Sequence, residues 1–457
     1  MRVRLIPIAA VLTAACASPP PVSPALSAST VAVAPASPIV FLEDDYASAE
    51  TKAKTEGKLV FVDVWAPWCH TCLSMKHGVL DSPVVASHGS GFVFASLDGD
   101  KDENAEFLAR YPVKVWPTLF AIDPVTRDAV AMYGGSLSAT ELAGFLDQAQ
   151  AAHSSSGPDP DLAKALAAAH AAFSSKNLAE AERLYTAAAA RPWARRNEAL
   201  IGAMRAFSAA KDFPACGAFG LAHLRDVSGT SSPADFVDDL RTCAQQSTDL
   251  DLKERIESLT LERLRALADQ AHEGASVDDR ADLLDMLADA EAKAGNKTRA
   301  RAAEELRVSI LEEAATKAGS PEGSRVFDYE RMGAYLALGR GEDAVKLFEG
   351  RVHDFPDSYE AWARLASTLH AVGRDKDALA AVEKAVTLAY GPRKLRYLGL
   401  RAEIQRGLGD LDGAVASLEE EVRGAKALPT GQRDDARIED AEGRLARAKE
   451  ARAATKQ

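Results

Sequence analysis

The fold of the first part of this chain is decided by the stretch Leu59-Val60-Phe61-Val62-Asp63-Val64-Trp65-Ala66-Pro67-Trp68-Cys69-His70-Thr71-Cys72. Its first seven residues are apolar except for Asp63, and they are rich in β-branched and aromatic side chains. Such a run is typical of a strand that is buried on both faces. The strand leads directly into a Cys-x-x-Cys pair, which places Cys69 at the N-terminus of the next helix.

That position favours thiolate chemistry at Cys69. The free N–H groups and the dipole of a helix N-terminus stabilise negative charge, and the thiolate is the form of cysteine that attacks disulfides. Cys72, one helical turn further on, is expected to be more buried and to resolve the mixed disulfide that Cys69 forms. The pair therefore predicts thiol–disulfide exchange.

Other interpretations of the pair are a permanent structural bridge or half of a zinc site. Zinc needs a second pair of ligands, and no nearby Cys-x-x-Cys or His-x-His supplies one. A copper site formed by Cys69, Cys72 and His77 is a weaker interpretation, which rests on the preference of Cu(I) for thiolate ligands. We favour redox exchange over all three.

The sequence on either side predicts a mixed α/β domain over residues 39–152. A helix is expected over 43–56, ending at Gly57. The remaining expected elements are strands over 92–97, 118–122 and 129–133, and helices over 102–110 and 139–151.

The motif Val62-Asp63-Val64-Trp65-Ala66-Pro67-Trp68-Cys69-x-x-Cys72, followed by Trp116-Pro117-Thr118, resembles the thioredoxin family. The continuation through Met75, Val79 and Asp81-Ser82-Pro83-Val84 is similar to the periplasmic C-terminal domain of thiol:disulfide interchange proteins. The resemblance covers about 110 of the 457 residues. It implies an α/β thioredoxin-like domain, with a central mixed sheet flanked by helices, and an oxidoreductase that uses its cysteine pair and no other cofactor.

The resemblance also implies roles for residues outside the cysteine pair. In the family, the aspartate that matches Asp63 relays a proton to or from the resolving cysteine, and burial raises the pKa of such a carboxyl. The alternative is an aspartate held by structural hydrogen bonds. Pro117 matches a cis-proline, which implies that the backbone of Trp116 meets an extended substrate. The ring of Trp116 either lines that substrate groove, or packs on Trp68 or covers the disulfide.

Two departures limit what the resemblance implies. The dipeptide His70-Thr71 stands where common thioredoxins have Gly-Pro. A protonated His70 favours the Cys69 thiolate and makes the couple more oxidising, whereas a neutral His70 only shapes the substrate-binding surface together with Trp68. The lysine that neighbours the buried aspartate in many thioredoxins is missing, and Phe94 is expected in its place. The direction of electron flow is therefore left open.

The N-terminus predicts export. In residues 1–15, two arginines precede a short apolar run, as in a secretory signal peptide, and the run is too short to span a membrane. Ala14-Ala15-Cys16 resembles a bacterial lipobox, which implies a lipid on Cys16; ordinary cleavage nearby is the alternative. Residues 16–38 are rich in Pro, Ala and Ser and are expected to be a linker.

The same N-terminus implies a compartment. Ala17 follows Cys16 where an aspartate often signals retention at the inner membrane, so we expect the periplasmic side of the outer membrane, with membrane contact through the lipid anchor only. That compartment tolerates disulfides. The net charge of −13 argues against a nucleic-acid partner, which would need basic patches.

The second half of the chain predicts an all-α helical solenoid. After a linker at residues 153–160, the apolar period is helical, and an internal repeat runs through 161–430. Ala344, Ala378 and Ala414 stand 34 and 36 residues apart, at tetratricopeptide spacing. The match is strong over 327–424 and poor over 225–275. The charged segment 431–457 is expected to be a capping helix.

Cys216 and Cys243 lie in this helical half, 27 residues apart. In an oxidising compartment they are expected to form a structural disulfide between neighbouring helices. The alternative is two separate buried thiols.

These features together predict an envelope thiol–disulfide oxidoreductase that acts on protein cysteines. Its partners are expected to be protein thiols or disulfides, an electron donor or acceptor that the sequence does not identify, and a protein or peptide bound by the repeats. The rival hypothesis is a lipid-anchored scaffold whose thioredoxin-like part is not catalytic. No Ser-His-Asp set, phosphate-binding loop or zinc motif is visible in the helical half.

Overall fold

The structure is a computed structural model, and it describes residues 39–154, 159–270 and 274–455. The predicted signal peptide, the lipidation site Cys16 and the linker over 16–38 lie outside these residues, so their assignments remain predictions. None of the described helices is both long enough and apolar enough to cross a membrane.

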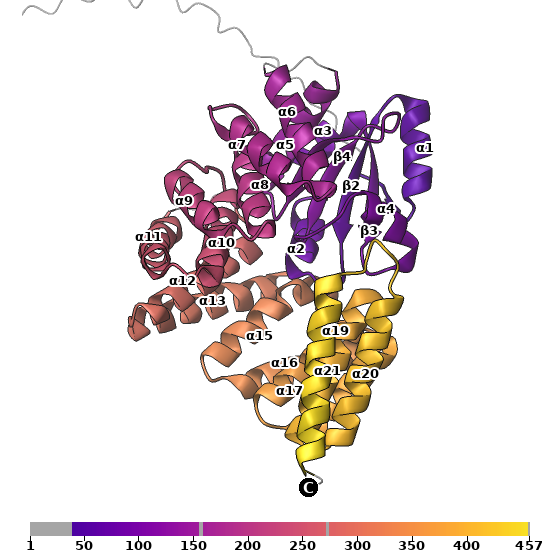
Figure 1. Cartoon of the computed structure of the whole chain (residues 1–457), viewed down its shortest axis with the longest axis vertical. Coiled ribbons are helices and arrows are strands. Elements are labelled where there is room, and N and C mark those ends of the chain that lie inside the picture. Colours follow the sequence, from indigo (N-terminus) through magenta and orange to yellow (C-terminus); the bar gives the residue numbers. More distant parts are fainter. Residues whose placement is uncertain (1–38, 155–158, 271–273, 456–457) are drawn as a thin grey trace, which may run out of the picture. The chain divides into compact units, whose positions relative to one another are not determined.

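The first domain is built on a sheet of five strands in the order β1-β3-β2-β4-β5 (Figure 1). β3 pairs in parallel with both β1 and β2, whereas β4 runs antiparallel to β2 and to β5. The strands are β1 (Phe41–Glu43), β2 (Leu59–Trp65), β3 (Phe92–Asp98), β4 (Thr118–Ile122) and β5 (Ala129–Gly134). The α-helices are α1 (Tyr46–Glu56), α2 (His70–Gly78), α3 (Pro83–His88), α4 (Ala105–Arg110) and α5 (Ala139–His153).

The predicted elements of this domain are confirmed, with differences at the ends of two helices, and β1 and α3 were not among them. The helix expected from residue 43 begins at Tyr46, because Phe41–Glu43 pairs with β3 and the Asp45 side chain caps the helix by accepting from the Ser48 N–H. The helix expected over 102–110 starts with a 3₁₀ turn, so that only Ala105–Arg110 is α-helical. The strand β1 was not predicted, because three residues are too few to show a period.

Alternate side chains of β2 point into two different cores. Val60, Val62 and Val64 pack with α1 and α4 on one face of the sheet. Leu59 and Phe61 face the other way, toward a core that includes residues of α2, α3 and α5. Since the side-chain period of a strand is two, Asp63 shares the face of β2 that α2 covers.

The rest of the described chain is helical, as predicted, and contains no strand between residues 159 and 455. Figure 1 shows these helices following one another from magenta to yellow. They are α6 (Pro160–Ser174), α7 (Leu178–Ala189), α8 (Arg196–Ala209), α9 (Phe213–His223), α10 (Ser232–Gln246), α11 (Leu250–Ala268), α12 (Val277–Lys293), α13 (Lys297–Lys317), α14 (Pro321–Ser324), α15 (Asp328–Ala337), α16 (Gly341–Asp354), α17 (Tyr359–Ala371), α18 (Asp375–Leu388), α19 (Gly391–Gly407), α20 (Leu411–Ala427) and α21 (Asp435–Thr455).

The repeat is visible in the turns between paired helices. α12/α13, α15/α16, α17/α18 and α19/α20 are joined at glycines with positive φ, namely Gly295, Gly339, Gly373 and Gly409. A side chain other than glycine is strained in that conformation. The alanines that marked the spacing, Ala344, Ala378 and Ala414, are buried. α10 and α11, in the region that matched the repeat poorly, are instead joined through an extended Ser247 and the capping residue Asp249.

A second disulfide joins Cys216 of α9 to Cys243 of α10, with 6.1 Å between the Cα atoms. Both cysteines are buried in the apolar core of the helices. The structure therefore holds a bridge between adjacent helices rather than two separate thiols.

The α/β domain and the helices share one core. Residues 37–457 form one unit, and the core over the α2, α3 and α5 side of the sheet continues into α6, α7 and α8 through Leu166, Tyr185 and Ile201. Arg195, at the start of α8, donates to the Val130 carbonyl of β5 at 3.2 Å. The predicted boundary near residues 153–160 therefore does not separate two independent hydrophobic cores.

Candidate functional site

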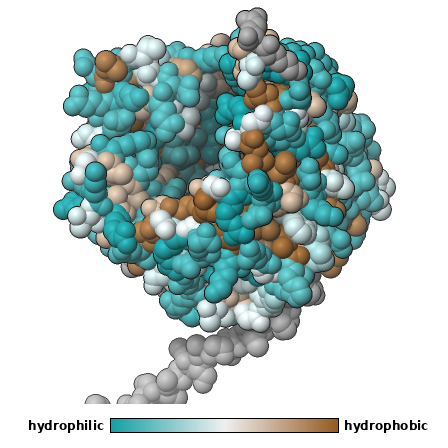
Figure 2. All heavy atoms as spheres, turned by 90° about the horizontal axis from the view of Figure 1, so that it is seen from below, coloured by the Kyte–Doolittle hydropathy of each residue, from teal (hydrophilic) through white to brown (hydrophobic). Residues whose placement is uncertain are grey.

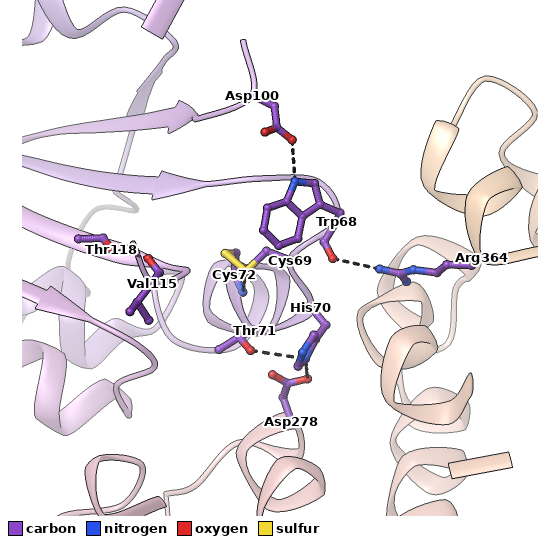
Figure 3. The surroundings of a disulfide bond; sticks show 10 residues. All are labelled: Trp68, Cys69, His70, Thr71, Cys72, Asp100, Val115, Thr118, Asp278 and Arg364. Atoms are coloured by element: carbon purple, nitrogen blue, oxygen red, sulfur yellow. Dashed lines mark hydrogen bonds and ion pairs between the residues drawn. A yellow bond between two sulfur atoms is a disulfide. The ribbon is translucent and has the colours of Figure 1, made fainter. Parts of the chain in front are cut away.

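Cys69 and Cys72 lie where β2 passes into α2, and they form a disulfide with 5.2 Å between the Cα atoms (Figure 3). Cys69 is the N-cap of α2, and the Cys72 N–H donates to Cys69 Sγ at 3.0 Å. In the reduced protein the same N–H and the helix dipole stabilise a Cys69 thiolate. Cys69 is 4% exposed and Cys72 is 1% exposed, so both cysteines are buried in this structure.

Aromatic rings enclose the disulfide. Trp68 and Trp116 pack against the two cysteines, and their ring centroids lie 5.2 Å apart in an edge-to-face arrangement. The Trp116-Pro117 peptide bond is cis. The Trp116 ring packs on Trp68 and against the cysteines, and a further role in lining a substrate groove stays a prediction.

Asp63 is buried in β2, on the face that α2 covers, and lacks a partner on one oxygen. It is 2% exposed, and its Oδ2 accepts no hydrogen bond from any described residue. Burial raises the pKa of Asp63 to about 7, against the opposing positive charge of Lys76. Because no hydrogen bond from a described residue holds this oxygen, the carboxyl can take up or release a proton near neutral pH.

Phe94, which is expected in the place of the family's lysine, does not lie opposite Asp63. Strand pairing sets Ser96 opposite Asp63, whereas Phe94 pairs with Phe61. A lysine is nevertheless present, since Lys76 of α2 donates to Ser96 Oγ at 3.4 Å and lowers the pKa of Asp63 electrostatically. The lysine comes from a helix rather than from β3, and sequence alignment alone could not find it.

His70 is held by residues of the helical array. Its Nδ1 lies 2.9 Å from Asp278 Oδ1, its Nε2 lies 3.7 Å from Glu330 Oε1, and its ring stacks on Tyr329 with centroids 4.7 Å apart. Burial by itself lowers the pKa of His70, but the carboxylates of Asp278, Asp282 and Glu330 outweigh it and raise the pKa to about 10. His70 is therefore an imidazolium cation at neutral pH.

Trp68 is held from both parts of the chain. Its indole N–H donates to Asp100 Oδ2 at 2.6 Å, and its carbonyl accepts from Arg364 of α17 at 3.3 Å (Figure 3). The guanidinium of Arg393 lies 4.3 Å from the centroid of the Trp68 ring. Burial raises the pKa of Asp100 to about 7, which the hydrogen bond from Trp68 opposes.

Two further contacts tie the array to the loop after β3. Tyr390 donates its hydroxyl to Asp98 Oδ2 at 2.5 Å. The Gln432 side-chain amide donates to the carbonyls of Gly99 and Lys101 at 3.1 and 2.9 Å. The array thus contacts the site on the His70 side, at Trp68 and at the β3 end.

One group of side chains in the described residues could hold a metal ion. Ligand atoms of His70, Asp282 and Glu330 lie within 4.8 Å of one another. This group includes no cysteine, and Glu330 Oε2 is already paired with the Arg307 guanidinium. His77, the third member of the predicted copper site, lies exposed on α2 and belongs to no such group among the described residues.

Several residues at the site were not predicted. These residues all come from the helical half and lie between 208 and 324 positions after Cys69 or His70. They are Asp278, Tyr329, Glu330, Arg364 and Arg393. No spacing rule links them to the cysteine pair. The only sequence signal was a general one, namely that acidic and basic residues recur on helices that form an array.

Comparison with known proteins supports the α/β assignment. Residues 46–150 match a protein-family model described as a thioredoxin-like domain. A thioredoxin H-type from Oryza sativa subsp. indica is 36% identical over 90 residues, which make up 19% of this chain and 69% of that protein.

Solved structures similar to this chain include tetratricopeptide proteins. A tetratricopeptide repeat protein from Parabacteroides merdae ATCC 43184 covers 63% of this chain and 98% of its own, with 12% identity and a TM-score of 0.41. The TPR2AB domain of yeast Sti1, solved as a pHSP90 complex, covers 64% of this chain and 99% of its own, with 14% identity and a TM-score of 0.24. The helix pairs and their turn glycines, rather than these partial superpositions, define the array as tetratricopeptide-like.

Proposed function

Because this chain belongs to the thioredoxin-like family through residues 46–150, we propose that Cys69 and Cys72 carry out thiol–disulfide exchange with protein cysteines. The observation that carries the proposal is the position of the disulfide at the N-terminus of α2, on the same side of β2 as the buried, incompletely partnered Asp63. A structural bridge needs neither the helix N-terminus nor a carboxyl with a pKa of about 7.

The exchange proceeds in two displacements. In the reduced protein, the Cys69 thiolate attacks a client disulfide, forms a mixed disulfide and releases one client thiolate, which takes up a proton. The Cys72 thiol then loses its proton to Asp63, and its thiolate attacks Cys69 Sγ. The second client thiolate leaves, and the client has gained two electrons while the Cys69–Cys72 disulfide forms. The reverse sequence oxidises a client dithiol.

Access to the disulfide involves the helical array. Cys69 is only 4% exposed, and Trp68 and His70 on either side of it are held by Arg364 and Asp278. A client therefore reaches Cys69 Sγ when these contacts open. We assign to the repeats the binding of the client, and to the backbone at Trp116 and Pro117 its docking beside the disulfide.

The N-terminal features extend the proposal to location. A signal peptide followed by Cys16 supports an envelope protein with a lipid anchor on the periplasmic side of the outer membrane. The Cys216–Cys243 disulfide is compatible with an oxidising compartment.

A second candidate function is a binding scaffold, and the burial of the disulfide favours it. If the Cys69–Cys72 disulfide is never reduced in the folded protein, it is a structural bridge. Partner binding by the helical array is then the function of the chain. The two candidates differ in whether Cys69 ever bonds to another protein.

Trapping distinguishes the two candidates. In Cys72→Ala the mixed disulfide on Cys69 cannot be resolved, so clients should accumulate as adducts that disappear on reduction. The matched control is the double variant Cys69→Ala/Cys72→Ala, which should trap nothing. Adducts confined to the single variant support exchange, and an absence of adducts in both variants supports the scaffold.

A further inference from the structure

The C-terminal repeats contain a groove of about 790 Å³. It is lined by α15, α17, α19, α20 and α21, with apolar side chains such as Met332, Leu400 and Leu418 between charged ones. Figure 2 views the molecule from below and shows a face that is hollowed, with mainly hydrophilic residues around the hollow.

The net charge of the residues that line this groove is positive, whereas the net charge of the whole chain is negative. Six arginines and three glutamates line it, which gives the lining a net charge of +3, whereas the whole chain carries −13. The arginines are Arg364, Arg393, Arg396, Arg406, Arg444 and Arg447, and the glutamates are Glu360, Glu403 and Glu421. The groove is therefore a local cationic surface on an anionic protein.

Half of these arginines have no internal partner. Arg364 and Arg444 pair with Glu360 and Glu421. Arg396, Arg406 and Arg447 are exposed, and none of them forms a hydrogen bond or an ion pair with another residue of the described chain. Three guanidinium groups in one groove are thus available to an external anion.

The groove extends from the redox site. Tyr329, Arg364 and Arg393 line it, and the same three side chains contact His70 and Trp68 beside the disulfide. From Arg393 the lining continues along one face of α19 to Arg406. At 1.5 Å per helical residue this distance is about 20 Å, the length of about six residues of extended peptide.

We propose that this groove binds an acidic segment of the client polypeptide and so places the neighbouring client cysteine at Cys69. The proposal rests on the proposed function and adds the substrate class. Guanidinium groups bind carboxylates in a bidentate manner, and the apolar side chains between them contact the rest of an extended peptide. The length of the groove places the acidic residues within about six positions of the client cysteine.

The first test measures binding without redox chemistry. Two fluorescein-labelled peptides without cysteine are compared by fluorescence anisotropy, one rich in glutamate and one with glutamine at the same positions. Three exposed ion pairs predict binding of the glutamate peptide about tenfold tighter than that of the glutamine peptide. Equal affinity of the two peptides would overturn the proposal.

The groove is identified by a charge-matched pair of variants. Arg396→Gln/Arg406→Gln/Arg447→Gln should abolish the preference for glutamate. The control variant is Arg255→Gln/Lys346→Gln/Lys384→Gln, which removes the same amount of positive charge. Its three positions are exposed, lie outside the groove and have no ion-pair partner in the described chain. This control should retain the preference for the glutamate peptide. If both variants lose affinity equally, the effect is one of net charge and the proposal fails.

The second test separates this proposal from the proposed function. The reduced protein reacts with two peptides whose cysteine is disulfide-bonded to mercaptoethanol, flanked by glutamates or by glutamines, and with the disulfide of mercaptoethanol itself. The glutamate peptide should react about tenfold faster than the glutamine peptide in the wild type and equally fast in the groove variant. The rate with the small neutral disulfide should be the same in both proteins.

These measurements give different results if thiol exchange fails and if peptide binding by the groove fails. Reaction with the small disulfide, without any preference between the peptides, leaves thiol exchange standing and overturns the groove. No reaction with any disulfide, while the glutamate peptide still binds through Arg396, Arg406 and Arg447, overturns the exchange and leaves the groove.

Discussion

The described residues contain two disulfides that differ in their surroundings although both are buried. Cys69–Cys72 spans three positions at the N-terminus of α2, against two tryptophans and close to the imidazolium of His70. Cys216–Cys243 spans 27 positions and joins α9 to α10 inside an apolar core of leucine, isoleucine and methionine side chains. Burial and the sulfur–sulfur bond are common to both, so they cannot distinguish a redox site from a structural bridge.

The difference lies in what can stabilise a thiolate and move its proton. At the first disulfide, the Cys72 N–H contacts Cys69 Sγ, and Asp63 is buried on the side of the sheet that α2 covers. At the second, the cysteines lie inside two helices, where the N–H groups are used within the helix. We therefore expect the first disulfide to cycle and the second to hold the helices together.

The largest expected difference is in activity. Cys69→Ala should reduce the rate of insulin reduction to that of the uncatalysed reaction, because the nucleophile is gone. Cys216→Ala/Cys243→Ala should keep most of the wild-type rate at a temperature where it is folded. An insulin turbidity assay on both variants is the measurement, and activity that survives Cys69→Ala would place the chemistry elsewhere.

Stability should show the opposite order. In the chain-entropy description, loss of a bridge that closes a 27-residue loop lowers the free energy of unfolding by about 3–4 kcal/mol, and loss of a bridge over three positions lowers it by about 2 kcal/mol. Urea unfolding of Cys216→Ala/Cys243→Ala and of Cys69→Ala/Cys72→Ala compares them. A greater loss at the Cys69–Cys72 pair would identify it as the structural bridge.

The pKa of Asp63 predicts how the rate of exchange at the first disulfide depends on pH. With a pKa of about 7, Asp63 is protonated in acid and accepts the Cys72 proton only above that value, so the rate of mixed-disulfide resolution should rise from about pH 6 to 8. Asp63→Asn should remove this rise and slow resolution by about tenfold to a hundredfold at pH 8. Stopped-flow measurement of product release from a preformed mixed disulfide follows this step.

The stability of the same variant tests the burial of Asp63 separately. Its pKa is raised from the ordinary 3.8 to about 7 in the folded state, so the folded state binds more protons than the unfolded state between these values. The free energy of unfolding of the wild type should therefore fall as pH rises through this window. Asp63→Asn should show a shallower fall, because Asp100, whose pKa burial also raises to about 7, keeps its own contribution. An unchanged profile in the variant would show that other groups cause the whole fall.

The smallest expected effect concerns the interaction between His70 and Asp278 of the helical array. Asp278→Asn removes a carboxylate that keeps His70 protonated, so the pKa of His70 should fall from about 10 by about 1–2 units. NMR titration of the imidazole measures this, and Asp81→Asn, at an exposed position of the same domain, is the control. An equal pKa in the wild type and in Asp278→Asn would contradict the contact between His70 and the array.

The sequence allowed prediction of those features whose causes are local. The apolar run of β2, the helix N-terminus at Cys69 and the 34-residue spacing of small residues each appear within a few helical turns or one repeat. The positive charge that acts on Asp63 was not predicted, because Lys76 comes from a neighbouring helix. The residues that hold His70 and Trp68 could not be predicted, since their positions depend on how the helices from α3 to α18 stack between them and the cysteines.

The most direct test of the difference between the two disulfides is a redox titration that follows each cysteine separately. The protein is equilibrated in dithiothreitol buffers of graded potential, quenched with acid and alkylated, and the labelling of each cysteine is measured by mass spectrometry. We predict that Cys69 and Cys72 gain and lose two electrons together and reversibly in the folded protein, while Cys216 and Cys243 stay bonded. Joint reduction of both pairs, or opening of Cys69–Cys72 only on unfolding, would contradict the account.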